Sequence, residues 1–140
     1  MKFGIATTVA IPYVRAVERI KEELTKEGFG VITSIDMRET FQKKLGVEFK
    51  QYCILGACNP GFALQALQAD ETIGLLLPCN IIVAEQGSET MVAAFDPLAI
   101  SALVDRPEVE EIAREVKIRL ERALRALSPA RAAEGLRQVP

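Results

Sequence analysis

The stretch FKQYCILGACNP, residues 49–60, decides the fold because it joins the end of a strand to the start of a helix. Every second position from 49 to 55 is suited to one buried face, which is the period of two typical of a strand. Asn59 is a favourable N-cap, and Pro60 suits the first helical position because an N–H there has no intrahelical partner. The stretch therefore predicts a strand that runs into Gly56 and a helix that begins at Pro60.

The sequence on the N-terminal side shows the same alternation of periods. Residues 3–9 predict a strand with one buried face, and an amphipathic helix follows that begins at Pro12 and ends at Gly28. Residues 29–35 alternate again and predict a second strand. After it we expect one or two helical turns at most, capped by Asp36 or Thr40 and stopped by Gly46.

The sequence on the C-terminal side is more apolar. Residues 73–84 are nearly all apolar except at Pro78-Cys79-Asn80, and we favour one long strand, broken at the proline, over two strands joined by a turn. Residues 85–88 are turn-forming and residues 91–95 predict the partner strand of a hairpin. The helix after Pro60 should bury a stripe of Ala63, Leu64 and Leu67.

The longest helix is predicted after Pro107. Asp105 and Glu108 have the spacing of a capping box, and apolar residues then recur every three or four positions from Val109 to Leu124. Residues 128–140 lack such a period, so we expect a loosely ordered C-terminal tail. Residues 1–127 then form one α+β domain of two layers, with a mainly antiparallel sheet and helices packed on one face.

The composition excludes several classes of function. The 140 residues include 49% hydrophobic and 26% charged residues, and a net charge of -2 gives no general attraction for nucleic acid. No apolar run approaches the roughly 20 residues of a membrane span, and no signal peptide is recognisable. We therefore expect a cytoplasmic protein without nucleic-acid or membrane partners, in which Cys53, Cys58 and Cys79 are mostly reduced.

Two Cys-Asn pairs, Cys58-Asn59 and Cys79-Asn80, concentrate the polar chemistry of the apolar regions. The start of the helix after Asn59 could lower the pKa of the Cys58 thiol through the helix dipole. The chain has no histidine, which excludes a Cys–His catalytic pair. We take these four residues as candidate ligand-binding residues, to which asparagine would supply hydrogen bonds if the two pairs converge.

Other interpretations of the thiols stay open. Free cysteines often behave as small buried apolar residues, with Asn59 and Asn80 satisfying only local backbone groups. Cys58 and Cys79 could form a disulfide if they lie close enough. A zinc site is disfavoured because there are only three cysteines, and Cys53 is expected to point away from Cys58. We expect no metal and no cofactor.

Residues 56–60, 75–83 and 96–97 resemble the signature of the small prokaryotic family catalogued as domain of unknown function 302. The resemblance covers roughly residues 1–127. It implies a compact α+β domain with an antiparallel sheet, similar in layout to the TATA-box-binding-protein architecture, and it implies homodimers. It brings no reaction with it.

Three hypotheses for function follow, and they leave open whether the protein is an enzyme. The first is a module that binds a small molecule in a pocket near Cys58, Asn59, Cys79 and Asn80. The second is a thiol-based enzyme or redox sensor that uses Cys58 and Cys79. The third is a structural or self-association domain that acts through an apolar sheet edge or helix face.

Overall fold

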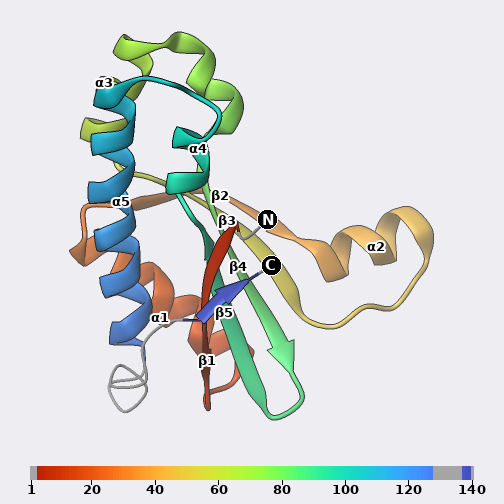
Figure 1. Ribbon diagram of the computed structural model, residues 1–140. Coiled ribbons are helices and arrows are strands. Elements are labelled where there is room, and N and C mark those ends of the chain that lie inside the picture. Colours follow the sequence, from red (N-terminus) through yellow and green to blue (C-terminus); the bar gives the residue numbers. More distant parts are fainter. Residues whose placement is uncertain (1–2, 128–136, 140) are drawn as a thin grey trace.

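A computed structural model of the chain describes residues 3–127 and 137–139, and it forms two layers (Figure 1). One layer is an antiparallel sheet in the order β2-β3-β4-β5-β1-β6. The strands are β1 (Gly4–Val9), β2 (Gly30–Asp36), β3 (Tyr52–Cys58), β4 (Cys79–Gln86), β5 (Glu89–Phe95) and β6 (Arg137–Val139). The helices are α1 (Tyr13–Lys26), α2 (Met37–Leu45), α3 (Pro60–Ala69), the 3-10 helix η1 (Glu71–Leu76), α4 (Leu98–Ser101) and α5 (Pro107–Ala126). The predicted α+β class and the antiparallel sheet are confirmed.

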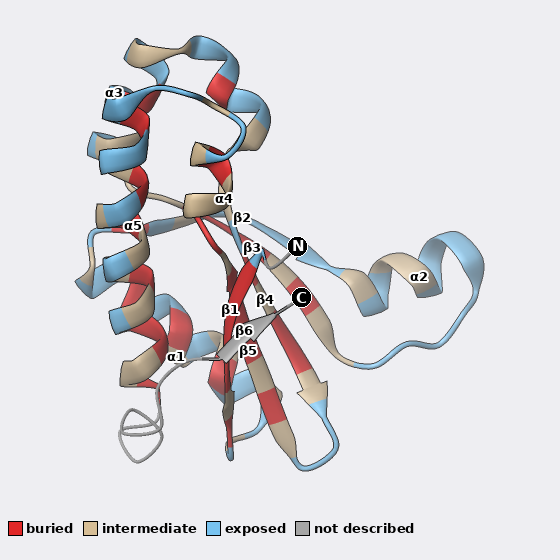
Figure 2. Ribbon diagram, in the orientation of Figure 1, coloured by how far each residue is buried: buried red, intermediate tan, exposed pale blue. Residues whose placement is uncertain are grey.

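The main core lies between the sheet and the helices α1 and α5 (Figure 2). Alternate residues of the central strands face these helices, including Leu55 of β3 and Val83 of β4, and both are fully buried. Ile20 of α1 and Leu120 of α5 meet them from the helical layer. Burial of such apolar side chains supplies the main stabilising free energy of the fold.

A smaller core joins α3, η1, α4 and α5 at one end of the molecule. Its fully or nearly buried members are Ala66, Ile73, Ile100 and Val109. It is separate from the main core, so this end of the molecule has its own packing. The candidate site lies between the two clusters.

The prediction of one long strand over residues 73–84 is wrong. Residues 71–76 form η1, whose first turn is fixed by Asp70, because one carboxylate oxygen accepts hydrogen bonds from both the N–H and the hydroxyl of Thr72. The strand β4 begins only at Cys79, directly after Pro78. Proline has no N–H to donate to a ladder, so the pairing of β4 starts after it.

Two local expectations about the helices are also wrong. Helix α3 buries Ala66 rather than Leu64 and Leu67, which are 59% and 38% exposed. Helix α5 has Arg106 at its N-cap without a side-chain hydrogen bond, so Asp105 forms no capping box. A short helix rich in apolar residues can bury more than one of its faces. The packing of η1 against α3 determines which face is buried.

The start of the chain differs from prediction in two details. Pro12 is the N-cap of α1 and not its first helical residue, and its carbonyl accepts the N–H of Ala16 at 2.9 Å. In β1 both faces are buried from Gly4 to Thr7. The strand lies between β5 and β6 in the sheet.

The segment from β2 to β3 departs most from the prediction. β2 has a register shift between Val31 and Thr33, which moves Ile35 to the face opposite Val31. Helix α2 has nine residues, more than the two turns expected, and it is capped by the carboxylate of Asp36, which accepts the N–H of Glu39 at 3.0 Å. Gly46 ends it in the left-handed conformation with φ 63°.

The expected tail falls largely outside the described residues, because 128–136 and 140 are not among them. Residues 137–139 form β6, which pairs with β1. Within the described part of the chain, the search for a helix long and apolar enough to cross a bilayer finds none.

Candidate functional site: an apolar cavity beside the two Cys-Asn pairs

Strands β3 and β4 bring the two Cys-Asn pairs together. Ala57 pairs with Cys79 and Gly56 pairs with Asn80 in the antiparallel ladder. Cys58 follows Ala57 at the end of β3, next to the point where β4 begins. The two thiols are free and close enough for the charge of one to act on the other. The convergence on which the site hypothesis depends is therefore present.

Asn59 carries out the capping role that the sequence predicts. Its side-chain oxygen accepts the N–H of Phe62 at 3.4 Å, and Pro60 occupies the first turn of α3. The amide of Asn59 also lies beside Gly28, which has φ 86°, at the end of α1. A side chain at Gly28 would meet the Asn59 nitrogen at 3.0 Å, so this glycine gives the amide its space.

A cavity of about 380 Å³ lies against these residues. Its floor is the end of β3 and the start of β4, where Ala57, Cys58 and Cys79 line it. α3 and η1 form one wall, and α5 forms another. The volume falls in the range of roughly 300–1,000 Å³ that is usual for ligand sites.

The walls of the cavity are made by small residues facing large apolar ones. Ala63 and Ala66 of α3, Gly74 of η1 and Ala113 of α5 all line it. These residues have little or no side chain, so α3, η1 and α5 pack around an open volume rather than filling it. Larger residues such as Ile112 complete the apolar surface.

Among residues 3–127 and 137–139, no charged side chain lines the cavity. Its polar groups are the amide of Asn59 and the thiols of Cys58 and Cys79, and the other lining residues are apolar, proline or glycine. An ion placed here would lose its hydration without gaining a partner of opposite charge. The cavity therefore suits an uncharged, apolar occupant.

Burial, together with the smaller effect of a negative charge on the neighbouring Cys58, raises the pKa of Cys79 to about 11. The low polarity around the thiol disfavours its charged form. At neutral pH the Cys79 side chain is a neutral thiol. It is a weak hydrogen-bond donor and not a ready nucleophile.

The remaining sequence candidates lie elsewhere. Asn80 is exposed and does not line the cavity, because alternation along β4 turns it away from the face of Cys79. Cys53 is buried in the main core, and burial raises its pKa while a hydrogen bond with Tyr13 opposes that shift. Three of the four candidate residues thus border the cavity, and Cys53 is not part of it.

Within residues 3–127 and 137–139, no group of three or more His, Cys, Asp or Glu side chains is placed to hold a metal ion.

The sequence did not predict that α5 forms one side of the cavity. Ile112 and Val116 were recognisable only as members of an apolar helical stripe, and Ala113 gave no signal of its own.

Comparison with known proteins identifies relatives but no activity. The model of the family described as "Domain of unknown function DUF302" matches residues 5–127. The crystal structure of an uncharacterized conserved DUF302 protein from Bacillus stearothermophilus is similar, with a TM-score of 0.84 and 29% sequence identity. That similarity covers 90% of this chain and 98% of the other. No protein of curated function matches the chain.

Proposed function

Because the chain belongs to the DUF302 family, whose description assigns no activity, we propose its function from the cavity: it binds a small, uncharged, apolar molecule between α3, η1, α5 and the sheet. The observation that carries the proposal is the apolar lining of a volume of about 380 Å³. Apolar cavities exclude water readily and accept apolar guests.

The thiols and the Asn59 amide would contact the polar group of such a ligand. Cys58, Asn59 and Cys79 lie together on one side of the cavity, and the opposite walls are apolar. A ligand with a hydrocarbon body and one weakly polar group, such as a carbonyl or ether oxygen, matches this distribution. A carboxylate or phosphate does not match it, since none of the cationic side chains in the described part of the chain lines the cavity.

The thiol-based alternative has less support. A nucleophilic cysteine needs a lowered pKa, and the pKa of Cys79 is raised to about 11. We therefore propose Cys79 as part of the cavity wall. A homodimer, which the family resemblance implies, and a cytoplasmic location, which the sequence predicts, remain proposals beside ligand binding.

The test is a fluorescence titration with N-phenyl-1-naphthylamine, a neutral apolar probe. The protein should bind it saturably at one site per chain. Ala113→Leu places three more carbons in the cavity and should weaken binding by about tenfold or more, which corresponds to about 1.4 kcal/mol. Ala63→Leu, from the opposite wall, should act in the same direction.

Ala102→Leu is the matched control, because Ala102 is exposed and does not line the cavity. This variant should bind the probe like the unmodified chain. Equal affinity in all of these proteins would overturn the proposal, and so would the absence of saturable binding to the unmodified chain. Melting curves show whether each variant is folded at the temperature of the titration.

A further inference from the structure

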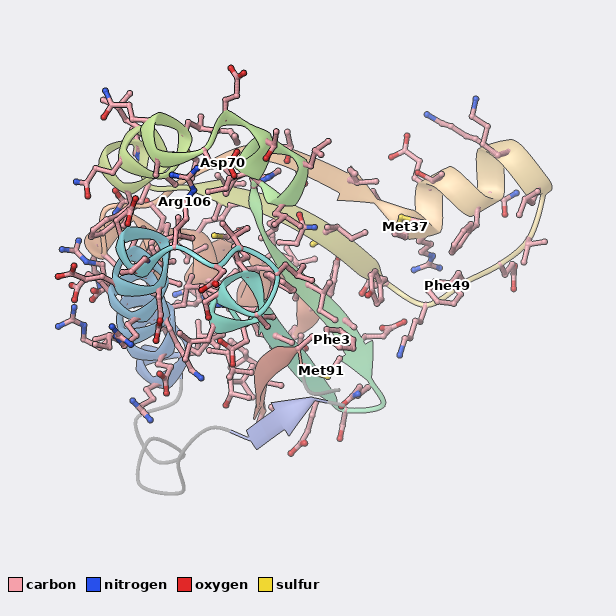
Figure 3. All side chains as sticks on the ribbon, turned by 45° about the horizontal axis from the view of Figure 1, so that its top comes forward. Phe3, Met37, Phe49, Asp70, Met91 and Arg106 are labelled. Atoms are coloured by element: carbon pink, nitrogen blue, oxygen red, sulfur yellow. The ribbon has the colours of Figure 1, made fainter. Side chains whose placement is uncertain are left out.

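The segment of residues 36–51, which we call the arm, extends from the body of the protein. It contains α2 and the loop that returns to β3, and it projects on the side of the sheet opposite α5 (Figure 1). Figure 3 shows Met37 and Phe49 of the arm set apart from the other labelled side chains. No residue of α2 is buried.

The arm nevertheless carries large apolar side chains. Leu45 is 68% exposed, Val47 is 50% exposed and Phe49 is 40% exposed. Within the arm, the Phe49 ring makes an edge contact with Phe41 at a centroid distance of 5.1 Å. An isolated helix of nine residues is marginal in water, because most helical stability in proteins comes from packing an apolar face. The Phe49 ring centroid also lies 6.1 Å from that of the Tyr52 ring of β3, so the arm packs on its own chain through this aromatic cluster. Leu45 and Val47 stay exposed.

The sheet has a largely apolar surface on the face turned away from α1 and α5, which could pack against the exposed apolar side chains of an arm. The ladder pairs align one row of residues across five strands and a second row across four. The first row is Ile35, Ile54, Ile82, Ala93 and Ala6, and the second is Tyr52, Ala84, Met91 and Thr8. We call these nine residues the open face.

The nine residues of the open face carry no charge, although the first row continues at Arg137 of β6, which pairs with Ala6. None of the nine belongs to the cluster that the sheet forms with α1 and α5. Ile35 is 47% exposed and Ile54, Ile82 and Met91 are half-buried, whereas Ala6, Ala84 and Ala93 are buried. A contiguous apolar surface of this kind is typical of a protein interaction site.

We propose that a second copy of this chain covers the open face, and that two copies exchange arms across a two-fold axis. Each copy offers an arm whose Leu45 and Val47 are exposed and a sheet face whose larger side chains are exposed or half-buried, and two such copies can cover each other about a two-fold axis. The arm and the open face together hold about 25 residues, within the roughly 20–30 that a standard interface takes from each partner.

This inference rests on the homodimer proposed above and adds the surfaces that form it. Light scattering coupled to size exclusion should give twice the chain mass of 15.3 kDa for the unmodified protein at micromolar concentration. Leu45→Glu in the arm and Ile82→Glu on the open face should each reduce that mass to one chain. Ile118→Glu is the matched control, since Ile118 is 50% exposed on α5, and this variant should stay dimeric.

The outcomes test the homodimer separately from the surfaces that are proposed to form it. A monomeric unmodified protein would overturn the homodimer, and the open face would then be free for a different partner. A dimer that persists in both Leu45→Glu and Ile82→Glu would overturn the surfaces but keep the homodimer. Loss of the dimer in Ile82→Glu alone would indicate contact between open faces and would overturn the exchange of arms.

A second measurement needs no variant and is independent of misfolding. Amide hydrogen exchange of residues 37–45 should slow as the protein concentration rises through the dimerisation range, because packing on the partner protects α2. Exchange in β3 and β4 reports the fold itself and serves as the internal reference. Exchange of α2 that does not depend on concentration would contradict the proposal.

Discussion

The cavity and the open face are both apolar and uncharged, and they lie on opposite sides of the same strands. The cavity is concave, is walled by α3, η1 and α5, and has thiols on its floor. The open face consists of two rows of side chains on the sheet, and the exposed arm extends from the same sheet. The shape of the surface, more than its polarity, separates a site for a small molecule from a site for a protein chain.

The two Cys-Asn pairs contribute to the cavity to different extents. Cys58-Asn59 ends a strand and caps a helix, so all of it borders the cavity. Cys79-Asn80 begins a strand, so alternation sends Cys79 to the cavity and Asn80 to the other face. The backbone around each pair decides what its side chains do.

The largest expected effect concerns the Cys79 thiol. Because its pKa is raised to about 11, alkylation by iodoacetamide at pH 8 should be roughly a hundredfold slower than that of an unfolded cysteine with a pKa of about 8.5. The rate should rise about tenfold per pH unit up to that pKa. Peptide mass spectrometry resolves Cys79 from the other cysteines, and the urea-unfolded protein is the control.

The same shift predicts the sign of a pH effect on stability. Between about pH 8.5 and pH 11 the unfolded chain releases the Cys79 proton while the folded chain retains it, so the folded state loses stability as the pH rises. Fast labelling at pH 8 in the folded protein would contradict both statements and would return Cys79 to the nucleophile hypothesis.

The next largest effect is expected at Gly56, where β3 passes between Thr33 and Pro78. A Cβ at Gly56 would overlap the Thr33 hydroxyl and would lie 2.7 Å from Cγ of Pro78. Gly56→Ala should therefore destabilise the fold by about 1–3 kcal/mol, the usual cost of overpacking. Urea unfolding measures it, with Gly30→Ala as the control, because a Cβ at Gly30 meets nothing within 4 Å.

A result for Gly56→Ala within about 0.5 kcal/mol of the unmodified chain, the usual range for surface substitutions, would contradict this packing. It would mean that Pro78 can move away from β3. The start of β4, and with it the floor of the cavity, would then be less firmly placed than the close approach at Gly56 indicates.

A smaller effect should distinguish the two asparagines. Asn59→Ala removes the N-cap of α3 and should cost about 1 kcal/mol of unfolding free energy, whereas Asn59→Asp keeps an accepting oxygen and should retain most of it. Asn80→Ala, at an exposed position, should change stability by less than about 0.5 kcal/mol. Urea unfolding of the three variants checks this order, and equal costs for Asn59→Ala and Asn80→Ala would contradict it.

Local signals in the sequence were sufficient for much of the fold. Asn59 and Pro60 mark the start of α3 correctly, and the period of α5 identifies its buried stripe, because capping and amphipathicity depend on neighbouring residues. The η1 helix was missed because its apolar residues resemble a buried strand, and only the Asp70–Thr72 hydrogen bonds distinguish the two.

The cavity was less predictable than the fold. The pattern of polar residues in apolar sequence predicts a site of Cys58, Asn59, Cys79 and Asn80, and all of these except Asn80 border the cavity. Its walls depend on which small residues of α3, η1 and α5 face each other, and that follows from helix packing at long range. The register shift in β2, which directs Ile35 to the open face, has no local signature either.

The central claim is that an apolar ligand enters the cavity and not the open face. Isoleucine methyl spectra recorded during a titration with N-phenyl-1-naphthylamine test it most directly, because isoleucines mark both regions. Ile32, Ile73, Ile100 and Ile112 line the cavity, whereas Ile35, Ile54 and Ile82 lie on the open face. The account predicts saturable shifts of the cavity isoleucine methyl groups, with those of the open face unchanged. Shifts confined to the open-face isoleucines, or no shifts at all, would contradict it.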